Sequence, residues 1–176
     1  MDADTDPPPA PRVAALGVQL AEVHDRLRER VEILRDSLAT TSGYAARDLP
    51  APPPDLRADL GADLRAHCLA FCHALTAHHE GEDDGLFAQL RRAEPALGPT
   101  IDKLVEDHHL ISGILERVEA LTRSGGERAR LVGELDGLTA IMNSHFAYEE
   151  RSITAAIDRL GATVAGRPWS AAVFTA

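Results

Sequence analysis

Apolar residues recur at steps of three and four along most of the chain, which is the spacing of one face of an α-helix. The pattern predicts four helices, at about residues 11–39, 55–92, 101–122 and 127–160. Their inward faces comprise Val13, Leu16, Leu20, Val23, Leu27, Val31, Leu34 and Leu38 in the first, Leu56, Leu60, Leu64, Phe71, Leu75 and Leu86 in the second, Ile101, Leu104, Ile111, Leu115 and Val118 in the third, and Leu131, Leu135, Leu138, Met142, Ile153 and Ile157 in the fourth. Amphipathic helices joined mostly by short turns favour an all-α fold, an antiparallel up-down-up-down four-helix bundle.

Proline and glycine positions divide the chain around this bundle. The three prolines at 7–9 cannot lie within a helix, and they predict a disordered N-terminal tail over residues 1–10. The bundle is then expected over residues 11–161, followed by a C-terminal tail over residues 162–176.

Four residues are expected to shape the helix ends and one bend. Thr100 is suited to cap the start of the third helix, and Gly161 follows the end of the fourth. Within the second helix, Gly81 and Gly85 each weaken helical structure by about 1 kcal/mol relative to alanine. These two glycines flank the most acidic stretch of that helix, so we expect it to bend or loosen there.

Composition and charge narrow the possible partners and location. The formal net charge of −10 makes nucleic acid and an anionic membrane surface poor partners. The N-terminus lacks the basic and apolar regions of a signal peptide, and no apolar stretch approaches the roughly 20 residues needed to span a bilayer. Two cysteines are too few for a disulfide scaffold. We therefore expect a soluble cytoplasmic protein, with its oligomeric state left open.

Polar residues interrupt the apolar faces at one level of every helix. The inward histidines are His24, His78, His108 and His145, one per helix. Glu82 and Glu149 each follow a histidine by four residues and therefore lie one turn further along the same face. Counted from the predicted helix ends at about 1.5 Å per residue, the four histidines lie at heights that agree to about two turns in an antiparallel bundle.

The combination of buried imidazoles and carboxylates points to metal. Burying a carboxylate without a partner costs several kcal/mol, and this pattern buries two of them close together. A pair of metal ions accounts for all six residues at once, with the carboxylates bridging the ions and the histidines in terminal positions. Such a mixed set suits iron, manganese or zinc. We favour two iron ions, because the six side chains leave room for an oxo or hydroxo bridge and an open position; zinc and manganese are the alternatives.

The ordered set of motifs resembles the hemerythrin-like family, also called the HHE cation-binding domain. The match is carried by Val-His-Asp at 23–25, His-His-Glu-Gly-Glu-Asp-Asp-Gly-Leu-Phe at 78–87, His-Phe-Ala-Tyr-Glu-Glu at 145–150 and, more weakly, Glu-Asp-His-His at 106–109, and it covers about residues 12–160. The resemblance implies a four-helix bundle whose metal ligands are His24, His78, Glu82, His108, His145 and Glu149.

The chain departs from the oxygen-carrying members of that family in its third and fourth helices. Those proteins present two histidines one turn apart in the third helix, whereas here the positions four residues either side of His108 are Leu104 and Ser112. In the fourth helix Glu149 follows its histidine by four residues, where the oxygen carriers place the carboxylate five after. We therefore expect one iron to have fewer protein ligands, which argues against reversible oxygen carriage and favours reaction with oxygen, peroxide or nitric oxide.

A second pair of residues repeats the spacing of the first pair in the second helix. His79 and Asp83 stand one residue after His78 and Glu82. The stripe that runs through Leu75 favours the earlier pair, but the spacing alone leaves open whether the later pair replaces it.

The remaining histidines, cysteines and acidic residues are predicted to lie outside the metal site. His67 lies on the predicted inward stripe but about 16 Å from His78, too far to join the same site. His73 is expected to face solvent. Cys68 and Cys72, one turn apart, are expected to be small buried thiols rather than a redox pair. Outer positions are expected for His109, Asp84 and Glu150. Tyr148, next to Glu149, is left open as an alternative hydrogen-bond donor or extra ligand.

Three functions fit a two-iron bundle. The first is a module that binds or reacts with oxygen, peroxide or nitric oxide. The second is a di-iron enzyme, either catalase- or peroxidase-like or an oxygenase with an unidentified organic substrate. The third is an iron or redox sensor, or a bundle that the metal merely stabilises. Nothing in the sequence specifies a substrate pocket, so small-oxidant binding comes first and enzymatic activity is left open.

Overall fold

The computed structural model describes residues 16–43, 54–125 and 127–163, and in these residues it contains helices and no strand. The elements in chain order are α1 (Leu16–Gly43), α2 (Pro54–Gly81), a π-helical turn (Glu82–Leu86), α3 (Phe87–Ala93), a 3-10 turn (Pro95–Leu97), α4 (Gly98–Ser124) and α5 (Arg128–Thr163). The all-α fold predicted from the spacing of apolar residues is confirmed.

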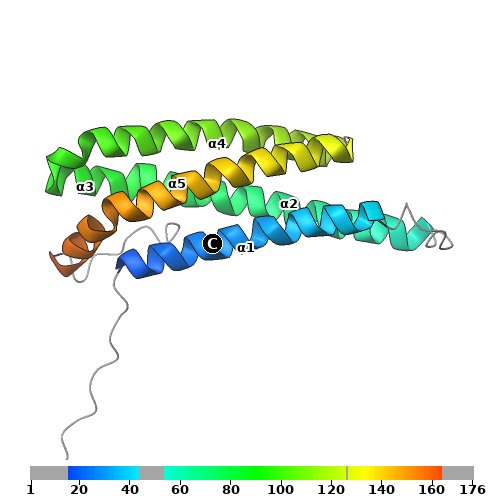
Figure 1. The fold of residues 1–176 in the computed structure, drawn as a ribbon, viewed down its shortest axis with the longest axis horizontal. Helices are drawn as coiled ribbons and strands as arrows, with labels where there is room; N and C mark the ends of the chain where they lie inside the picture. The colour runs from blue at the N-terminus through cyan, green and yellow to red at the C-terminus, as the bar shows by residue number, and fades with distance from the viewer. Residues whose placement is uncertain (1–15, 44–53, 126, 164–176) are drawn as a thin grey trace, which may run out of the picture.

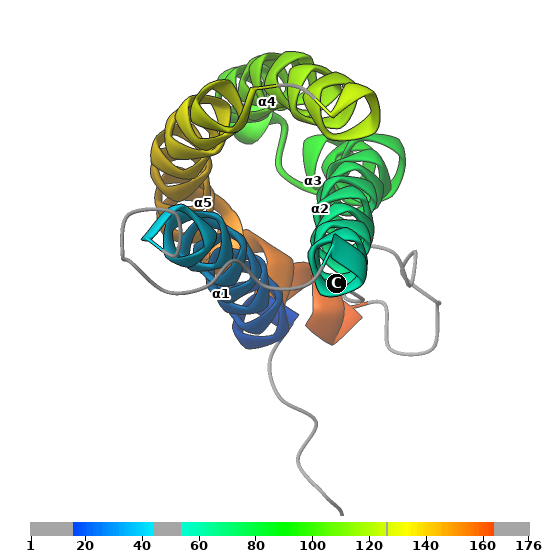
Figure 2. The same cartoon turned by 90° about the vertical axis from the view of Figure 1, so that its right-hand side faces the viewer.

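Four rods of helix lie side by side around a common core, and α3 continues the rod begun by α2 (Figure 1). Viewed along the bundle, α1, α2, α4 and α5 form a closed ring in that order (Figure 2). Arg28 pairs with Glu150, whereas Arg35, later in α1, pairs with Asp136, which precedes Glu150 in α5. α1 and α5 therefore run in opposite directions, and Figure 1 shows the same alternation for the other neighbours, as an antiparallel four-helix bundle requires.

The predicted inward residues form the core, which is divided into two hydrophobic clusters. One cluster includes Val23, Leu27, Val31, Phe71, Leu75, Ile111, Leu115, Leu138, Met142 and Phe146. The other includes Leu20, Leu86, Phe87, Leu90, Ile101, Leu104, Ile153 and Ile157. The histidines and glutamates singled out by the sequence are buried close to the junction of the two clusters, so the core contains one buried polar layer.

The second predicted helix, at about 55–92, is interrupted where its glycines and acidic residues suggested a bend. The amide of Phe87 donates a hydrogen bond to the carbonyl of Glu82, five residues back, as in a π-helix. Such a turn holds one residue more than an α-turn, which offsets the helix face by about 100°. His78 before the turn, Glu82 and Leu86 at its two ends and Phe87 after it are consequently all buried.

The helix ends differ by a few residues from the prediction. Thr100 does not cap α4, which begins at Gly98 with Pro99 in its first turn, where proline's missing amide hydrogen is not needed. Gly125 ends α4 with a left-handed φ of 66°. Gly161 lies inside α5 rather than after it. The predicted tail at 1–10 and all but the first two residues of the tail at 162–176 lie outside the described residues.

Within the described ranges, no helix combines the length and the apolar composition that crossing a membrane demands.

The π-turn predicts an unequal response to single-residue deletions in its rod. Deleting exposed Asp84 converts the turn to an α-turn and leaves both flanks facing the core. Deleting exposed His73, in the regular part of α2, instead rotates Phe71 or Leu75 away from the core. Loss of a buried large side chain costs about 2–5 kcal/mol, so thermal unfolding of the metal-free protein, followed by circular dichroism, should show the larger fall in melting temperature for the His73 deletion. Equal falls would contradict this role of the turn.

Candidate metal centre

The buried polar layer brings together all six residues that the sequence singled out. His24 comes from α1, His78 from α2, Glu82 from the first position of the π-turn, His108 from α4, and His145 and Glu149 from α5. None of the six is more than 1% exposed. Because each rod turns one face to the same core, the polar residues that replace apolar ones in each stripe meet at one level.

Two groups of side chains within this layer could each hold a metal ion. They are His24, His78, Glu82 and Glu149, and His79, Glu82, His108 and His145, with ligand atoms that lie within 4.8 Å of one another in each group. Glu82 belongs to both groups: its Oε1 lies 3.3 Å from the Nε2 of His78 and its Oε2 lies 3.5 Å from the Nε2 of His108. Glu149 Oε2 likewise lies 3.5 Å from His24 Nε2 and 3.6 Å from His145 Nε2. Both carboxylates therefore lie between two sets of imidazoles.

The spacing of the imidazoles fits ligation of a shared ion. The Nε2 atoms of His24 and His78 are 3.1 Å apart, and those of His108 and His145 are also 3.1 Å apart. Two nitrogens bound at about 2.1 Å to one ion lie about 3.0 Å apart at a right angle and about 3.4 Å apart in a tetrahedron. Each pair thus has the spacing of neighbouring ligands on one ion.

The protein alone leaves the glutamates unsatisfied. All four carboxylate oxygens of Glu82 and Glu149 are buried and accept no hydrogen bond from the described residues. Burial, and then the adjacent Glu149 carboxylate, hold the pKa of Glu82 well above its usual range. Burial also lowers the pKa of His145 to about 2, followed by the effect of neighbouring imidazoles, so this histidine supplies no positive charge. A pair of cations in the layer would satisfy both carboxylates.

Carboxylates outside the layer orient the imidazoles. The Nδ1 of His24 donates to Glu150 Oε1 at 2.8 Å, and the Nδ1 of His108 donates to Asp83 Oδ1 at 2.9 Å. Asp107 Oδ2 lies 3.7 Å from the Nδ1 of His145. A hydrogen on Nδ1 leaves the Nε2 lone pair directed into the layer, which is the tautomer that a metal ligand needs.

Further contacts hold the α1 side of this arrangement. Arg28 donates to Glu150 Oε1 at 3.0 Å. Burial tends to raise the pKa of Glu150, but the hydrogen bonds from His24 and Arg28 outweigh it and lower that pKa. The imidazole of His24 also stacks on the ring of Phe146 with centroids 3.9 Å apart. His24 is therefore held in place by its outer nitrogen and by its ring face.

The structure resolves the choice between the two adjacent pairs in α2 in an unexpected way. His78 and His79 are both buried, whereas Glu82 is buried and Asp83 lies at the rim with 32% of its side chain exposed. Adjacent residues are about 100° apart on a helix, and a core-facing stripe is at least that wide. Phe71 and Cys72, an adjacent apolar pair in the sequence, are likewise both fully buried.

The remaining candidates lie mostly outside the layer. The prediction that His67 faces inward is wrong: His67 is exposed because the core face of α2 at that level runs through Cys68, Phe71 and Cys72. The residues His73, Asp84 and His109 are exposed as expected, and half-buried Glu150 has the outer position described above. Half-buried Tyr148 packs against the cluster that contains Leu20, with the guanidinium of Arg151 5.8 Å from its ring centroid.

Comparison with known proteins identifies a family for most of the chain. A family model described as the hemerythrin HHE cation binding domain matches residues 18–157. That range includes all of the polar layer and parts of all four rods. No curated protein and no solved structure matches the chain.

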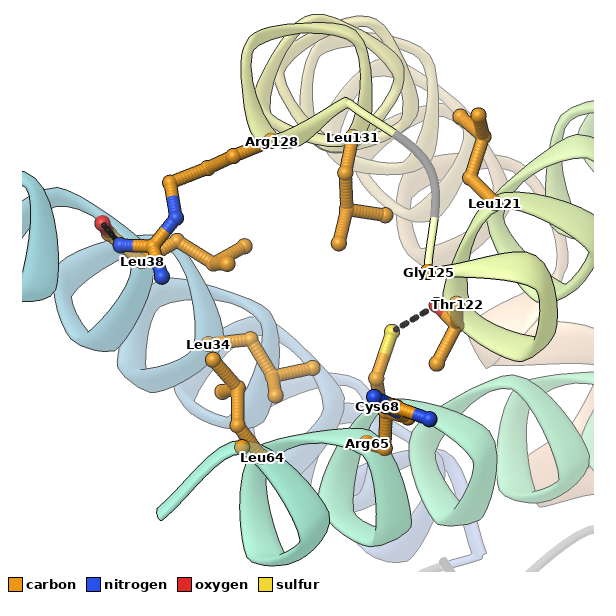
Figure 3. A pocket seen from close by; sticks show the side chains of 11 residues that line it. Leu34, Leu38, Leu64, Arg65, Cys68, Leu121, Thr122, Gly125, Arg128 and Leu131 are labelled. Atoms are coloured by element: carbon orange, nitrogen blue, oxygen red, sulfur yellow. Dashed lines mark hydrogen bonds between the residues drawn. The ribbon is translucent and has the colours of Figure 1, made fainter. Parts of the chain in front are cut away.

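A cavity of about 160 Å³ lies apart from the polar layer, near the end of the bundle where α4 ends and α5 begins (Figure 3). It is lined by Leu34, Leu38, Gly61, Leu64, Arg65, Cys68, Leu121, Thr122, Gly125, Arg128 and Leu131. Cys68 precedes His78 by ten residues, which is about 15 Å along a helix. The sulfur of Cys68 lies 3.3 Å from Thr122 Oγ1. Both cysteines are buried and free, as the sequence suggested.

The two thiols are expected to react very differently. A hydrogen bond from Cys72, opposed by burial and assisted by Thr122, lowers the pKa of Cys68 to about 7, whereas the same contact and burial raise the pKa of Cys72. Iodoacetamide alkylation of the cavity-lining Cys68, followed by peptide mass spectrometry, should rise with pH around a midpoint near 7, while Cys72 stays unmodified.

The Cys72→Ala variant removes the donor and is the matched control. Its Cys68 should titrate closer to the usual thiol value of about 8.5. A midpoint near that value in the unaltered protein would contradict the assigned hydrogen bond.

Proposed function

The chain belongs to the hemerythrin HHE cation-binding domain family, and from that premise we propose that its polar layer holds two iron ions that bind or react with small oxidants. The observation that carries the proposal is the pair of buried glutamates, each placed between two sets of imidazoles at 3.3–3.6 Å. Carboxylates in such positions are suited to bridge two ions.

The proposed ligands divide into two terminal pairs and two bridges. His24 and His78 would hold one ion and His108 and His145 the other, with Glu82 and Glu149 placed to serve both. Zinc or manganese would fit the same donors. Iron is proposed because the six side chains leave room for an oxo or hydroxo bridge and an open position. When bound, iron supplies a Lewis acid and a store of electrons.

The chain itself contributes orientation and exclusion of water. Glu150 and Asp83 accept hydrogen bonds from the outer nitrogens of His24 and His108, so the inner nitrogens keep their lone pairs toward the layer. The two hydrophobic clusters above and below the layer exclude bulk water from it. Electrostatic interactions in such a dry site are stronger than in solvent.

Small oxidants are favoured over an organic substrate by the position of the cavity. The cavity lined by Cys68 lies about 15 Å along the helix from His78, so a molecule inside it would not touch the layer. Oxygen, hydrogen peroxide and nitric oxide are small enough to enter a packed bundle through side-chain fluctuations. We propose no nucleic-acid or membrane partner, given the net charge of −10, and we propose a cytoplasmic location.

Metal content and the two glutamates provide the first test. The purified protein should contain two irons per chain and show near-ultraviolet oxo-to-iron absorption bands. Glu82→Ala and Glu149→Ala should each lower metal affinity by at least about tenfold and abolish the rise in melting temperature on metal addition. His73→Ala, an exposed histidine on the same rod, should behave as the unaltered protein. Zinc alone, no metal, or equal effects in all three variants would contradict the proposal.

Hydrogen peroxide separates a binding protein from an enzyme. Added to the iron-loaded protein, peroxide should change the absorption spectrum once per chain, without sustained oxygen release at an oxygen electrode. Continuous release would instead favour the catalase-like alternative. The Glu149→Ala variant, treated in the same way, controls for loosely bound iron.

A further inference from the structure

The two metal groups in the polar layer are unequal in histidines, because α2 contributes more than one. In α4 the only inward imidazole is that of His108; Leu104, four residues before it, is buried in a hydrophobic cluster, and Ser112, four residues after it, is only half-buried. In α2, by contrast, both His78 and His79 are buried. The helix next to α4 in the ring therefore holds one imidazole beyond the one-per-helix pattern.

The surroundings of His79 leave both of its ring nitrogens without a partner. The residue is only 3% exposed, and neither Nδ1 nor Nε2 makes a hydrogen bond to any described residue. His24 and His108, by comparison, each use the outer nitrogen on a carboxylate. A buried polar group without a partner is unfavourable, so an imidazole in this position requires an explanation.

The position of His79 places it beside the second pair of histidines. Its ring stacks on that of His108 with centroids 4.0 Å apart and planes 11° apart, and it meets the ring of His145 edge-on at 5.3 Å. Ligand atoms of His79, Glu82, His108 and His145 lie within 4.8 Å of one another.

We propose that His79 is the third imidazole ligand of the ion held by His108 and His145. The inference rests on the proposed two-metal site and deepens it. One ion then has two histidines, the other has three, and both share the bridging glutamates. The sequence led us to expect an ion with fewer protein ligands, because α4 lacks a second histidine; in this arrangement α2 supplies that ligand from the neighbouring rod.

The test is to count cobalt(II) ions bound by the metal-free full-length chain and its variants, by calorimetric titration and elemental analysis. The unaltered protein should bind two ions. His79→Ala should bind one with unchanged affinity and the other at least about tenfold more weakly. His73→Ala and His109→Ala, exposed histidines near the same positions in α2 and α4, should bind two as the unaltered protein does.

Two further variants separate loss of a ligand from loss of the fold. His79→Phe keeps a ring to stack on His108 but offers no nitrogen, so its metal-free form should remain folded by circular dichroism while the second ion is weakened as in His79→Ala. In His79→Gly, added imidazole should restore the second ion, because it can occupy the vacated space and supply the missing nitrogen.

The outcomes distinguish failure of His79 as a ligand from failure of the two-metal site itself. Fewer than two ions in the unaltered protein would overturn the two-metal site and His79 ligation together. Two ions in the unaltered protein and two of equal affinity in His79→Ala would overturn only the role of His79. In that case a changed response to peroxide would make His79 a hydrogen-bond donor to the oxidant instead of a ligand.

Discussion

Two carboxylates without solvent contact, placed between two hydrophobic clusters, impose the constraint on which the rest of this bundle depends. Glu82 and Glu149 are fully buried and accept no hydrogen bond from the described residues. Such groups are unfavourable in an apolar interior unless a cation or proton compensates them. Burial lowers the pKa of His145 to about 2, so this neighbouring imidazole supplies no compensating charge. Bound cations would compensate both carboxylates, in keeping with the cation-binding family to which the chain belongs.

The same residues that orient the proposed ligands also join the helices. His24 of α1 donates to Glu150 of α5, and His108 of α4 donates to Asp83 of the π-turn. Each of these contacts connects two neighbouring rods at the level of the polar layer. The site and the antiparallel packing consequently support each other: the packing sets the height of the ligands, and the outer carboxylates fix how the imidazoles point.

The sequence anticipated most of the bundle but not its detail in α2. Strong three-and-four spacing located every rod, because most of a buried helix face must be apolar. His67 was misplaced because its face depends on where α2 packs against its neighbours. His78 and His79 were treated as alternatives, although a broad core face admits both. The acidic stretch flanked by Gly81 and Gly85 indicated a weak point, and only the structure identified it as a π-turn.

The sequence alone therefore determined the four-rod architecture and the six polar residues at its centre, because both follow from which side of each helix a residue occupies. Tertiary structure decided which side chains of different helices contact one another. It placed Glu82 and Glu149 between two sets of imidazoles. It also brought Asp83 within hydrogen-bond distance of His108 and buried His79 without a hydrogen-bond partner among the described residues. These features depend on distances across the core and on the offset produced by one π-turn, and periodicity within a single helix carries no information about either.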